Sequence, residues 1–227
     1  MPRPRVPDRR GRILAAAREL LLAQGWERTT VADVAARAGI GKGAVYLEFA
    51  DRSAILAAVL NRAARDLTAD VHRRVLGSTE LLDLPTVYRY GVEALLADPI
   101  MRAVHLGDTA VLGDHVRQVS DDRYLRRYAW LTDYVARLQD AGVLDRAVPA
   151  DAVVQVLGIF ALGLVHAPGT LGPVPPEHLT GAVAVFADLV GRGLATDRPA
   201  DADAARAAQL ELLERLDRQL TTLQEDP

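Results

Sequence analysis

The sequence predicts an all-α protein, and three observations support that prediction. Nearly every long segment repeats its apolar residues at spacings of three and four, which is the period of an amphipathic helix. No segment alternates apolar and polar residues as a half-buried strand does. Of the 227 residues, 50% are hydrophobic and 25% are charged, which allows a buried core. We expect about nine or ten helices.

Three helices are expected to follow one another closely at the start of the chain, and the second and third of them are short. One covers about residues 8–24, because Gly25 is placed to end it. Thr30 and Asp33 have the spacing of a capping box for a second helix, which Gly39 ends. A third covers about residues 41–49. The buried stripe of the first helix is expected to consist of Ile13, Leu14, Ala17, Leu20 and Leu21.

Longer helices are expected after residue 51. Asp51 is placed to cap one that runs to Gly77, and Pro85 and Pro99 suit the first turns of two more. Helices follow at about 119–141, 153–166 and 179–193, with a loop rich in Pro and Gly over 168–176. A last helix, at about 202–223, is expected to pack on the body rather than trail in solvent. We divide the chain into an N-terminal domain (1–52), a central domain (53–196) and a C-terminal extension (197–227).

Composition limits the cellular setting and the chemistry. The chain has no cysteine, so it carries no disulfide, thiolate zinc site or cysteine nucleophile. Its start is basic and rich in proline, with no signal-peptide pattern, and its most apolar stretch is shorter than the ~20 residues of a membrane span. We therefore expect a cytoplasmic protein with no membrane partner. Residues 1–52 hold ten basic and six acidic residues, although the whole chain has a net charge of −3. A basic head on an acidic body favours a polyanion partner.

Residues 30–52 carry the functional signal. Two short helices joined by a turn with a glycine make a helix-turn-helix, in which Ala35 and Ala38 allow close packing and Ile40 fills the angle. Gly41 and Gly43 begin the second helix at a cost of about 1 kcal/mol each relative to alanine. Close approach to a DNA backbone is a sufficient reason for them.

This segment resembles the DNA-binding domain of the TetR family of regulators. The spacing of the family pattern is matched at Thr30, Val34, Ala35, Ala38, Gly39, Ile40, Gly43, Tyr46, Phe49 and Arg52. A weaker likeness extends over most of residues 8–196. There are two departures: Gly41 stands where the family often has Ser, and Glu48 where it often has His or an aromatic residue. A carboxylate at position 48 would repel DNA unless it turned away or accepted a hydrogen bond from a cytosine amino group.

The resemblance implies a role for each matched residue. Thr30, the free amides of its helix and the Tyr46 hydroxyl would meet phosphates, and Arg52 would be a basic phosphate anchor. Lys42 would face guanine or phosphate, while Ala44 and Val45 would face a thymine methyl. The DNA-binding set is thus Thr30, Gly41, Lys42, Gly43, Ala44, Val45, Tyr46 and Arg52.

The resemblance also implies that the body encloses a small-molecule pocket, whose occupation moves two DNA-binding heads apart. The usual mode of the family is repression. Tyr124 and Tyr128 lie on one face of their helix, and Trp130 and Tyr134 on another, so one of these pairs is placed to line a cavity. His105 and His166 would supply polar groups. We expect a largely apolar effector with at most one charge, and no cofactor.

The helices at 153–166 and 179–193 indicate a homodimer, because a helix that is apolar on all sides needs cover from a second subunit. Two other classes of protein fit the sequence less well. An enzyme is disfavoured because the sequence has no His-Glu-x-x-His motif, P-loop or nucleophile elbow, and only His105, Asp108 and His115 would offer a metal site. An architectural DNA binder without an effector leaves the large helical body unexplained. We therefore expect a regulator that binds a palindromic operator in double-stranded DNA.

Overall fold

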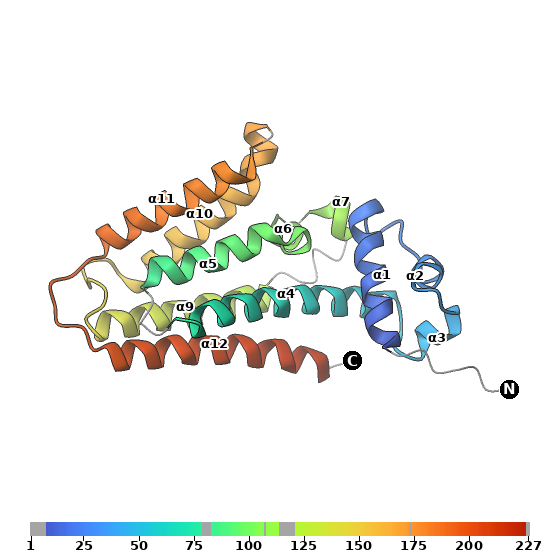
Figure 1. Ribbon diagram of the computed structural model, residues 1–227, viewed down its shortest axis with the longest axis horizontal. Coiled ribbons are helices and arrows are strands. Elements are labelled where there is room, and N and C mark those ends of the chain that lie inside the picture. The colour runs from blue at the N-terminus through green and yellow to red at the C-terminus, as the bar shows by residue number, and fades with distance from the viewer. Residues whose placement is uncertain (1–7, 79–82, 107, 114–120, 173, 226–227) are drawn as a thin grey trace.

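The computed structural model describes residues 8–78, 83–106, 108–113, 121–172 and 174–225, and within these ranges every regular element is an α-helix (Figure 1). The all-α prediction is confirmed. The described helices are α1 (Arg9–Gln24), α2 (Val31–Ala38), α3 (Lys42–Tyr46), α4 (Arg52–Leu76), α5 (Leu84–Ala97), α6 (Pro99–Leu106), α7 (Thr109–Leu112), α9 (Asp121–Asp140), α10 (Ala150–Leu171), α11 (Pro176–Gly193) and α12 (Ala202–Glu225). These 11 exceed the expected count, because a four-residue helix such as α7 is too short to show a period.

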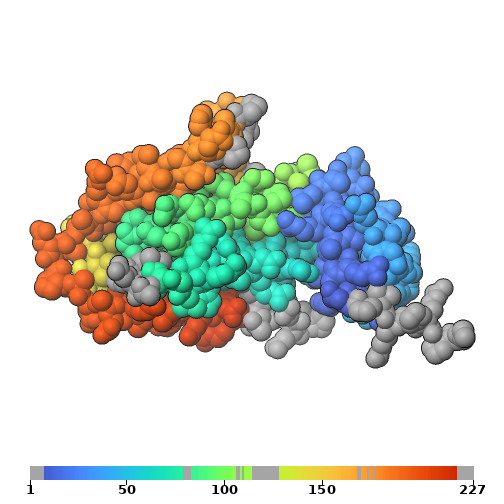
Figure 2. Space-filling model, viewed as in Figure 1, coloured from blue at the N-terminus to red at the C-terminus, as the bar shows by residue number. Residues whose placement is uncertain are grey.

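The molecule is elongated, with α1, α2 and α3 at one end and the other helices forming a long body (Figures 1 and 2). Helix α4 runs from this end into the body, where it contacts α5 and α12. Helices α10 and α11 lie on the opposite side of the body from α12 in this view, and their joined ends project from it. The N-terminal helices therefore occupy an exposed end with room for a large partner.

Side-chain caps begin α1, α4 and α5. The Asp8 carboxylate accepts a hydrogen bond from the Gly11 amide at 3.1 Å. Asp51 and Asp83 accept from the amides three residues on, each at 2.8 Å, and so start α4 and α5. Each cap satisfies an amide that has no partner within its helix.

One buried cluster joins the N-terminal helices to the body. Apolar residues of α1 to α4 pack with Ile100 and Met101 of α6, Leu112 of α7 and Val165 of α10. Ile100 is fully buried and Leu112 is 2% exposed. The buried core is thus continuous across residue 52. The predicted boundary at residue 52 therefore separates two functional parts of the chain and not two separate cores.

Helix α10 is longer than predicted. The expected segment of 153–166 extends to Ala150–Leu171, so the helix continues past Pro168 into the predicted loop. A proline removes one backbone hydrogen bond but does not by itself end a helix. The end comes at Gly172, whose φ of 85° lies in the left-handed region that glycine tolerates.

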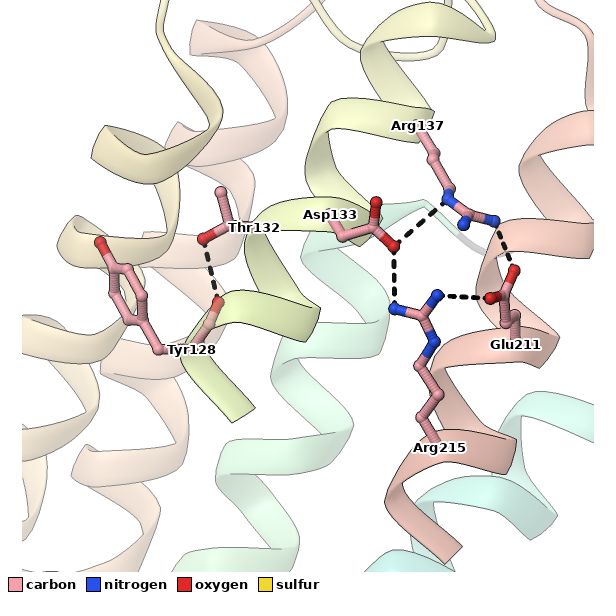
Figure 3. Close-up of polar contacts among 6 residues, drawn as sticks. All are labelled: Tyr128, Thr132, Asp133, Arg137, Glu211 and Arg215. Atoms are coloured by element: carbon pink, nitrogen blue, oxygen red, sulfur yellow. Dashed lines mark hydrogen bonds and ion pairs between the residues drawn. The ribbon is translucent and has the colours of Figure 1, made fainter. Parts of the chain in front are cut away.

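The C-terminal helix packs on the body, as predicted. Helix α12 lies along α9 and α4, and Ala205, Leu212 and Leu213 are buried there. Two ion pairs link α12 to α9 as well (Figure 3): Arg215 contacts Asp133 at 2.9 Å, and Arg137 contacts Glu211. Arg215 also pairs with Glu211 at 2.5 Å within α12, and Arg137 pairs with Asp133 within α9. Hydrogen bonds from Arg215 and Arg137 hold the pKa of Glu211 below its usual value. Exposed pairs of this kind stabilise a fold only modestly, so apolar burial is the main attachment of α12.

Candidate nucleic-acid interface

The helix-turn-helix has the predicted local structure. The Thr30 hydroxyl accepts from the Asp33 amide at 3.2 Å, and the Asp33 carboxylate accepts from the Thr30 amide at 2.9 Å, which is a complete capping box. Gly39 ends α2 with a φ of 66°. Arg12 of α1 donates to the Ala38 carbonyl at 2.6 Å, which adds a positive charge at the C-terminal end of α2.

The capping box yields a stability prediction. Thr30→Ala should lower the free energy of unfolding by about 1 kcal/mol, because the Asp33 amide loses its acceptor. Thr30→Ser keeps the hydroxyl and should stay close to the parent in urea unfolding. Hydrogen bonds from the Thr30 hydroxyl and then its amide hold the pKa of Asp33 below its ordinary 3.8. The contribution of the box is therefore complete above about pH 4 and is lost as pH falls through the lowered pKa. Equal stability of the alanine variant and the parent at pH 7 would contradict this assignment.

Helix α3 exposes one side and buries the other. Gly41, Lys42, Gly43 and Tyr46 are exposed and Ala44 is half-buried. Val45 is fully buried in the cluster shared by α1 to α4. Its side chain therefore holds α3 in place, and the prediction that it faces a thymine methyl is wrong. In a helix of five residues the apolar period is too short to show which of Ala44 and Val45 points inward.

Gly41 and Gly43 have no structural need for glycine within the described residues. Neither has a φ in the left-handed region, and a Cβ added to either would meet no atom within 4 Å. Alanine would make a better helix at position 43. The small size of these residues therefore leaves open space on the exposed side of α3.

Lys42, Tyr46 and Leu47 crowd this exposed side. The Lys42 ammonium lies 6.0 Å from the centre of the Tyr46 ring, and no described carboxylate pairs with it. Tyr46 is 49% exposed and Leu47 is 77% exposed. The sequence prediction missed Leu47, although the burial of Val45 and Phe49, four residues apart, would have placed it on the outer side.

The carboxylate of Glu48 is paired with a basic residue of α1. Its carboxylate forms an ion pair with Arg9 at 3.2 Å, and its carbonyl accepts from Arg10 at 3.2 Å. The Arg10 guanidinium also lies 4.5 Å from the centre of the Phe49 ring. Arg9 and Arg10 at the start of α1 thus offset the negative charge of Glu48, which we expected to lie near the DNA phosphates.

Arg52 is turned toward the interior. Its guanidinium donates to the carbonyls of Thr29, at 3.2 Å, and Glu27, at 3.4 Å, and lies 5.4 Å from the centre of the Trp26 ring. Other basic residues of the head are also engaged, since Arg18 pairs with Asp98 and Arg37 with Glu19. Part of the excess positive charge of residues 1–52 is therefore paired with groups of the chain itself.

The aromatic residues proposed for a ligand site do not converge. Tyr128 donates to the Asp151 carbonyl of α10 at 2.9 Å, whereas Tyr134 accepts from Gln209 of α12 at 3.4 Å. Tyr134 is 2% exposed, and burial raises its pKa to about 12. The cavity between Trp130, Tyr134 and α12 is about 10 Å³, too small for a ligand. Tyr128 and Tyr134 instead join α9 to α10 and α12, and the space beside the pair Trp130 and Tyr134 does not support its predicted role in lining a ligand cavity.

The other proposed ligand residues do not complete that pocket. His166 is exposed on α10, and His105 is half-buried near the end of α6. The side chain of Tyr124 lies outside the described residues, as does His115. Asp108 accepts from the Ala110 amide at 2.9 Å and starts α7, and the described residues contain no group of three side chains suited to a metal ion.

Two further surface features mark the body. A groove of about 470 Å³ lies between α5 and α11, and its lining consists of Asp83, Pro85, Thr86, Arg89, Ala184, Ala187, Asp188, Gly191, Arg192 and Ala195.

Elsewhere, α10 and α11 expose apolar side chains: Val156 (52%), Ile159 (62%), Val185 (62%) and Leu189 (61%). By length and composition, Ala150–Ala167 would pass for a membrane span, with mean hydropathy 1.8 and 33% of the window buried.

Comparison with known proteins agrees with this geometry. Residues 13–59 match the model of the bacterial regulatory proteins of the tetR family. The fold is similar to that of the fatty acid degradation regulator FadR from Bacillus halodurans, with 16% identity, a TM-score of 0.63 and coverage of 84% of this chain and 98% of that one. It is also similar to FadR from Bacillus subtilis, solved in complex with stearoyl-CoA, with 14% identity, a TM-score of 0.62 and coverage of 82% and 99%.

A third similar fold is that of a TetR-family regulator from Syntrophomonas wolfei, with 18% identity, a TM-score of 0.65 and coverage of 84% and 98%. The all-helical fold with a helix-turn-helix at one end defines the class as DNA-binding transcriptional regulators. Within that class, residues 13–59 match the TetR family, and the fold of the chain resembles that of a TetR-family regulator.

Proposed function

We propose that this chain is a homodimeric repressor that binds a palindromic operator and leaves it when a small, largely apolar molecule binds. The exposed side of α3 carries the proposal, because Lys42, Gly43 and Tyr46 are exposed and, among the described residues, Lys42 and Tyr46 contact mainly each other. Lys42 faces guanine or phosphate, and the Tyr46 hydroxyl meets a phosphate. Gly41 and Gly43 let the DNA approach. Leu47 joins this set through apolar contact with a sugar or a thymine methyl.

The N-terminal end of α2 supplies the second contact. The Thr30 hydroxyl is occupied by Asp33, so the contact falls to the first amides of α2, which have no acceptor within the helix. An amide pair at a helix start binds a phosphate without reading its base. Helix α3 therefore reads sequence, and α2 fixes the register of the protein on the duplex.

The apolar side of α10 and α11 is the proposed dimer interface. Val156, Ile159, Val185 and Leu189 lie on adjacent helices, and a second copy offers the same surface for a self-complementary contact. Val183 is fully buried within the protomer, beside Ala161 and Leu164. A charged residue at Val183 would therefore disrupt the core of the protomer and would not test the dimer interface. Charged residues at the exposed Ile159 and Leu189 test it.

The effector is proposed from the relatives and not from a formed pocket. FadR from Bacillus subtilis was solved with stearoyl-CoA, which carries a long apolar chain. The acyl chain of stearoyl-CoA fits the apolar effector expected from the sequence, whereas the phosphates of coenzyme A exceed the single charge that we expected. The volume of the groove between α5 and α11 falls within the ~300–1,000 Å³ range of ligand sites. The guanidinium groups of Arg89 and Arg192 would bind one anionic group there. Release of bound operator DNA on addition of fatty acyl compounds tests this part of the proposal.

The DNA-binding part is tested by the salt dependence of binding. Lys42→Ala should weaken operator binding and reduce the slope of log K against log salt by about 1, because one phosphate contact is lost. The matched control is Arg206→Ala, which removes a positive charge from α12 in the body and should leave the slope unchanged. Identical slopes for the parent and the Lys42 variant would remove Lys42 from the interface.

An architectural DNA binder is the alternative within the same class. Such a protein would coat DNA without enriching one sequence and would not respond to an effector. Competition with a large excess of random DNA separates the two, because a repressor retains its operator. We propose that the chain acts in the cytoplasm by binding and not by catalysis.

A further inference from the structure

Helix α7 of the body is docked on the loop that joins α1 to α2. The Trp26 amide donates to the Val111 carbonyl at 2.8 Å. Gly25 lies so close to α7 that an added Cβ would be 2.2 Å from the Ala110 carbonyl oxygen, and its φ is +79°. No side chain fits at this position, so the loop and α7 are held in direct backbone contact.

The docked loop is connected to Arg52 at the start of α4. Trp26 is 3% exposed and lies against the Arg52 guanidinium, which donates to the carbonyls of Glu27 and Thr29. Thr29 is fully buried, and its hydroxyl donates to the Gly25 carbonyl at 2.9 Å. These hydrogen bonds restrict the backbone of residues 25–29.

The next residue along the chain is Thr30, which caps α2. A displacement of the loop therefore reaches the first amides of α2 directly. The position of α7 in turn follows the body, because Leu112 is buried beside residues of α6, and α6 contacts α5 and α10. A continuous set of contacts thus runs from the body to the end of α2 that faces the phosphate.

We propose that Trp26 and Arg52 are positioning residues through which α7 sets the place of the N-terminal end of α2 on DNA. Arg52 then acts through the loop and does not contact a phosphate itself. The inference rests on the proposed DNA-binding function and adds to it a route by which the body controls affinity. A misplacement of about 1 Å at the α2 amides would lengthen their hydrogen bonds to a phosphate past the usual range.

The first test is Gly25→Ala, compared with Gly172→Ala. Both glycines have a positive φ, but a Cβ at Gly172 meets no atom within 4 Å. Both variants thus carry backbone strain, and only the first forces the loop away from α7. Gly25→Ala should weaken operator binding about tenfold and speed hydrogen exchange at the Asp33 amide, with Gly172→Ala within about twofold of the parent in both. Equal effects of the two variants, or no effect of the first, would overturn the proposal.

The second test uses Arg52→Ala and remains informative if the glycine variant folds poorly. Loss of the guanidinium should weaken binding about tenfold while leaving the salt slope unchanged, in contrast to Lys42→Ala. A slope reduced by about 1 would show a direct phosphate contact and refute the positioning role. A parent-like affinity would refute it as well.

Hydrogen exchange of the DNA-free protein separates this inference from the proposed function. Faster exchange at Asp33 in Gly25→Ala and Arg52→Ala supports the route from α7 to α2 even if no operator is found. Unchanged exchange in both variants contradicts the route, even if the parent binds its operator tightly.

Discussion

Lysine in place of Ile159 should convert the protein from a dimer into a monomer and weaken operator binding by about a hundredfold or more. Ile159 is 62% exposed at the middle of the apolar side of α10 and α11. In a two-fold dimer each lysine would face the same region of the partner, where burying an unpaired charge is costly. The affinity falls because the second head no longer binds as part of one assembly.

The measurement is the molar mass in solution, which should fall from twice the chain mass of 24.5 kDa to that mass. Leu189→Lys should behave in the same way, since Leu189 shares the apolar side at 61% exposure. Leu76→Lys is the matched control, because Leu76 is 51% exposed at the end of α4, away from this surface. An added lysine favours DNA binding in general, so weaker binding would not be a trivial charge effect. A parent protein that is a folded monomer at micromolar concentration would contradict the interface.

Alanine in place of Gly43 should make the protein more stable and yet a poorer DNA binder. Gly43 lies within α3 with open space around it, so the added methyl clashes with nothing in the chain. A helical Gly→Ala change stabilises by about 1 kcal/mol, which would raise Tm by ~2–4 °C in a chain of this size. On the operator the methyl would meet the DNA, and we expect binding at least about tenfold weaker.

Gly91→Ala provides the control for this prediction. Gly91 lies within α5 and also has no atom within 4 Å of an added Cβ. It should gain similar stability while keeping its operator affinity. Melting curves and binding titrations of the two variants give both quantities. Parent-like binding by the Gly43 variant would place the DNA elsewhere on the head.

The fold of the N-terminal head was largely predictable because its signals are local. Thr30 and Asp51 cap the helices that they were expected to cap, and Gly25 and Gly39 end the first two. A cap or a C-terminal glycine acts within one turn, so its residues are neighbours in the sequence. The departure at Glu48 was visible in the sequence, but its partner Arg9 was not, because the pair spans three helices.

The placement of the aromatic residues was not predictable. Helical spacing shows that Tyr128 and Tyr134 lie on different faces of α9, but it does not show which helix covers each face. Tyr128 contacts α10 and Tyr134 contacts α12, where the space beside Tyr134 is only about 10 Å³. Similarly, the strongly apolar character of 153–166 and 179–193 indicated an exposed side without showing that Val183 is internal and Ile159 external.

Selection of DNA from a random pool is the measurement that tests the central claim most directly. The dimer with two α3 helices predicts enrichment of an inverted repeat whose half-site centres lie about one helical turn, ~10 base pairs, apart. Lys42→Ala should enrich the repeat less strongly under the same salt conditions. Enrichment of an unrepeated site, or no enrichment by a well-folded parent protein, would contradict the claim that two copies of this chain read a palindromic operator.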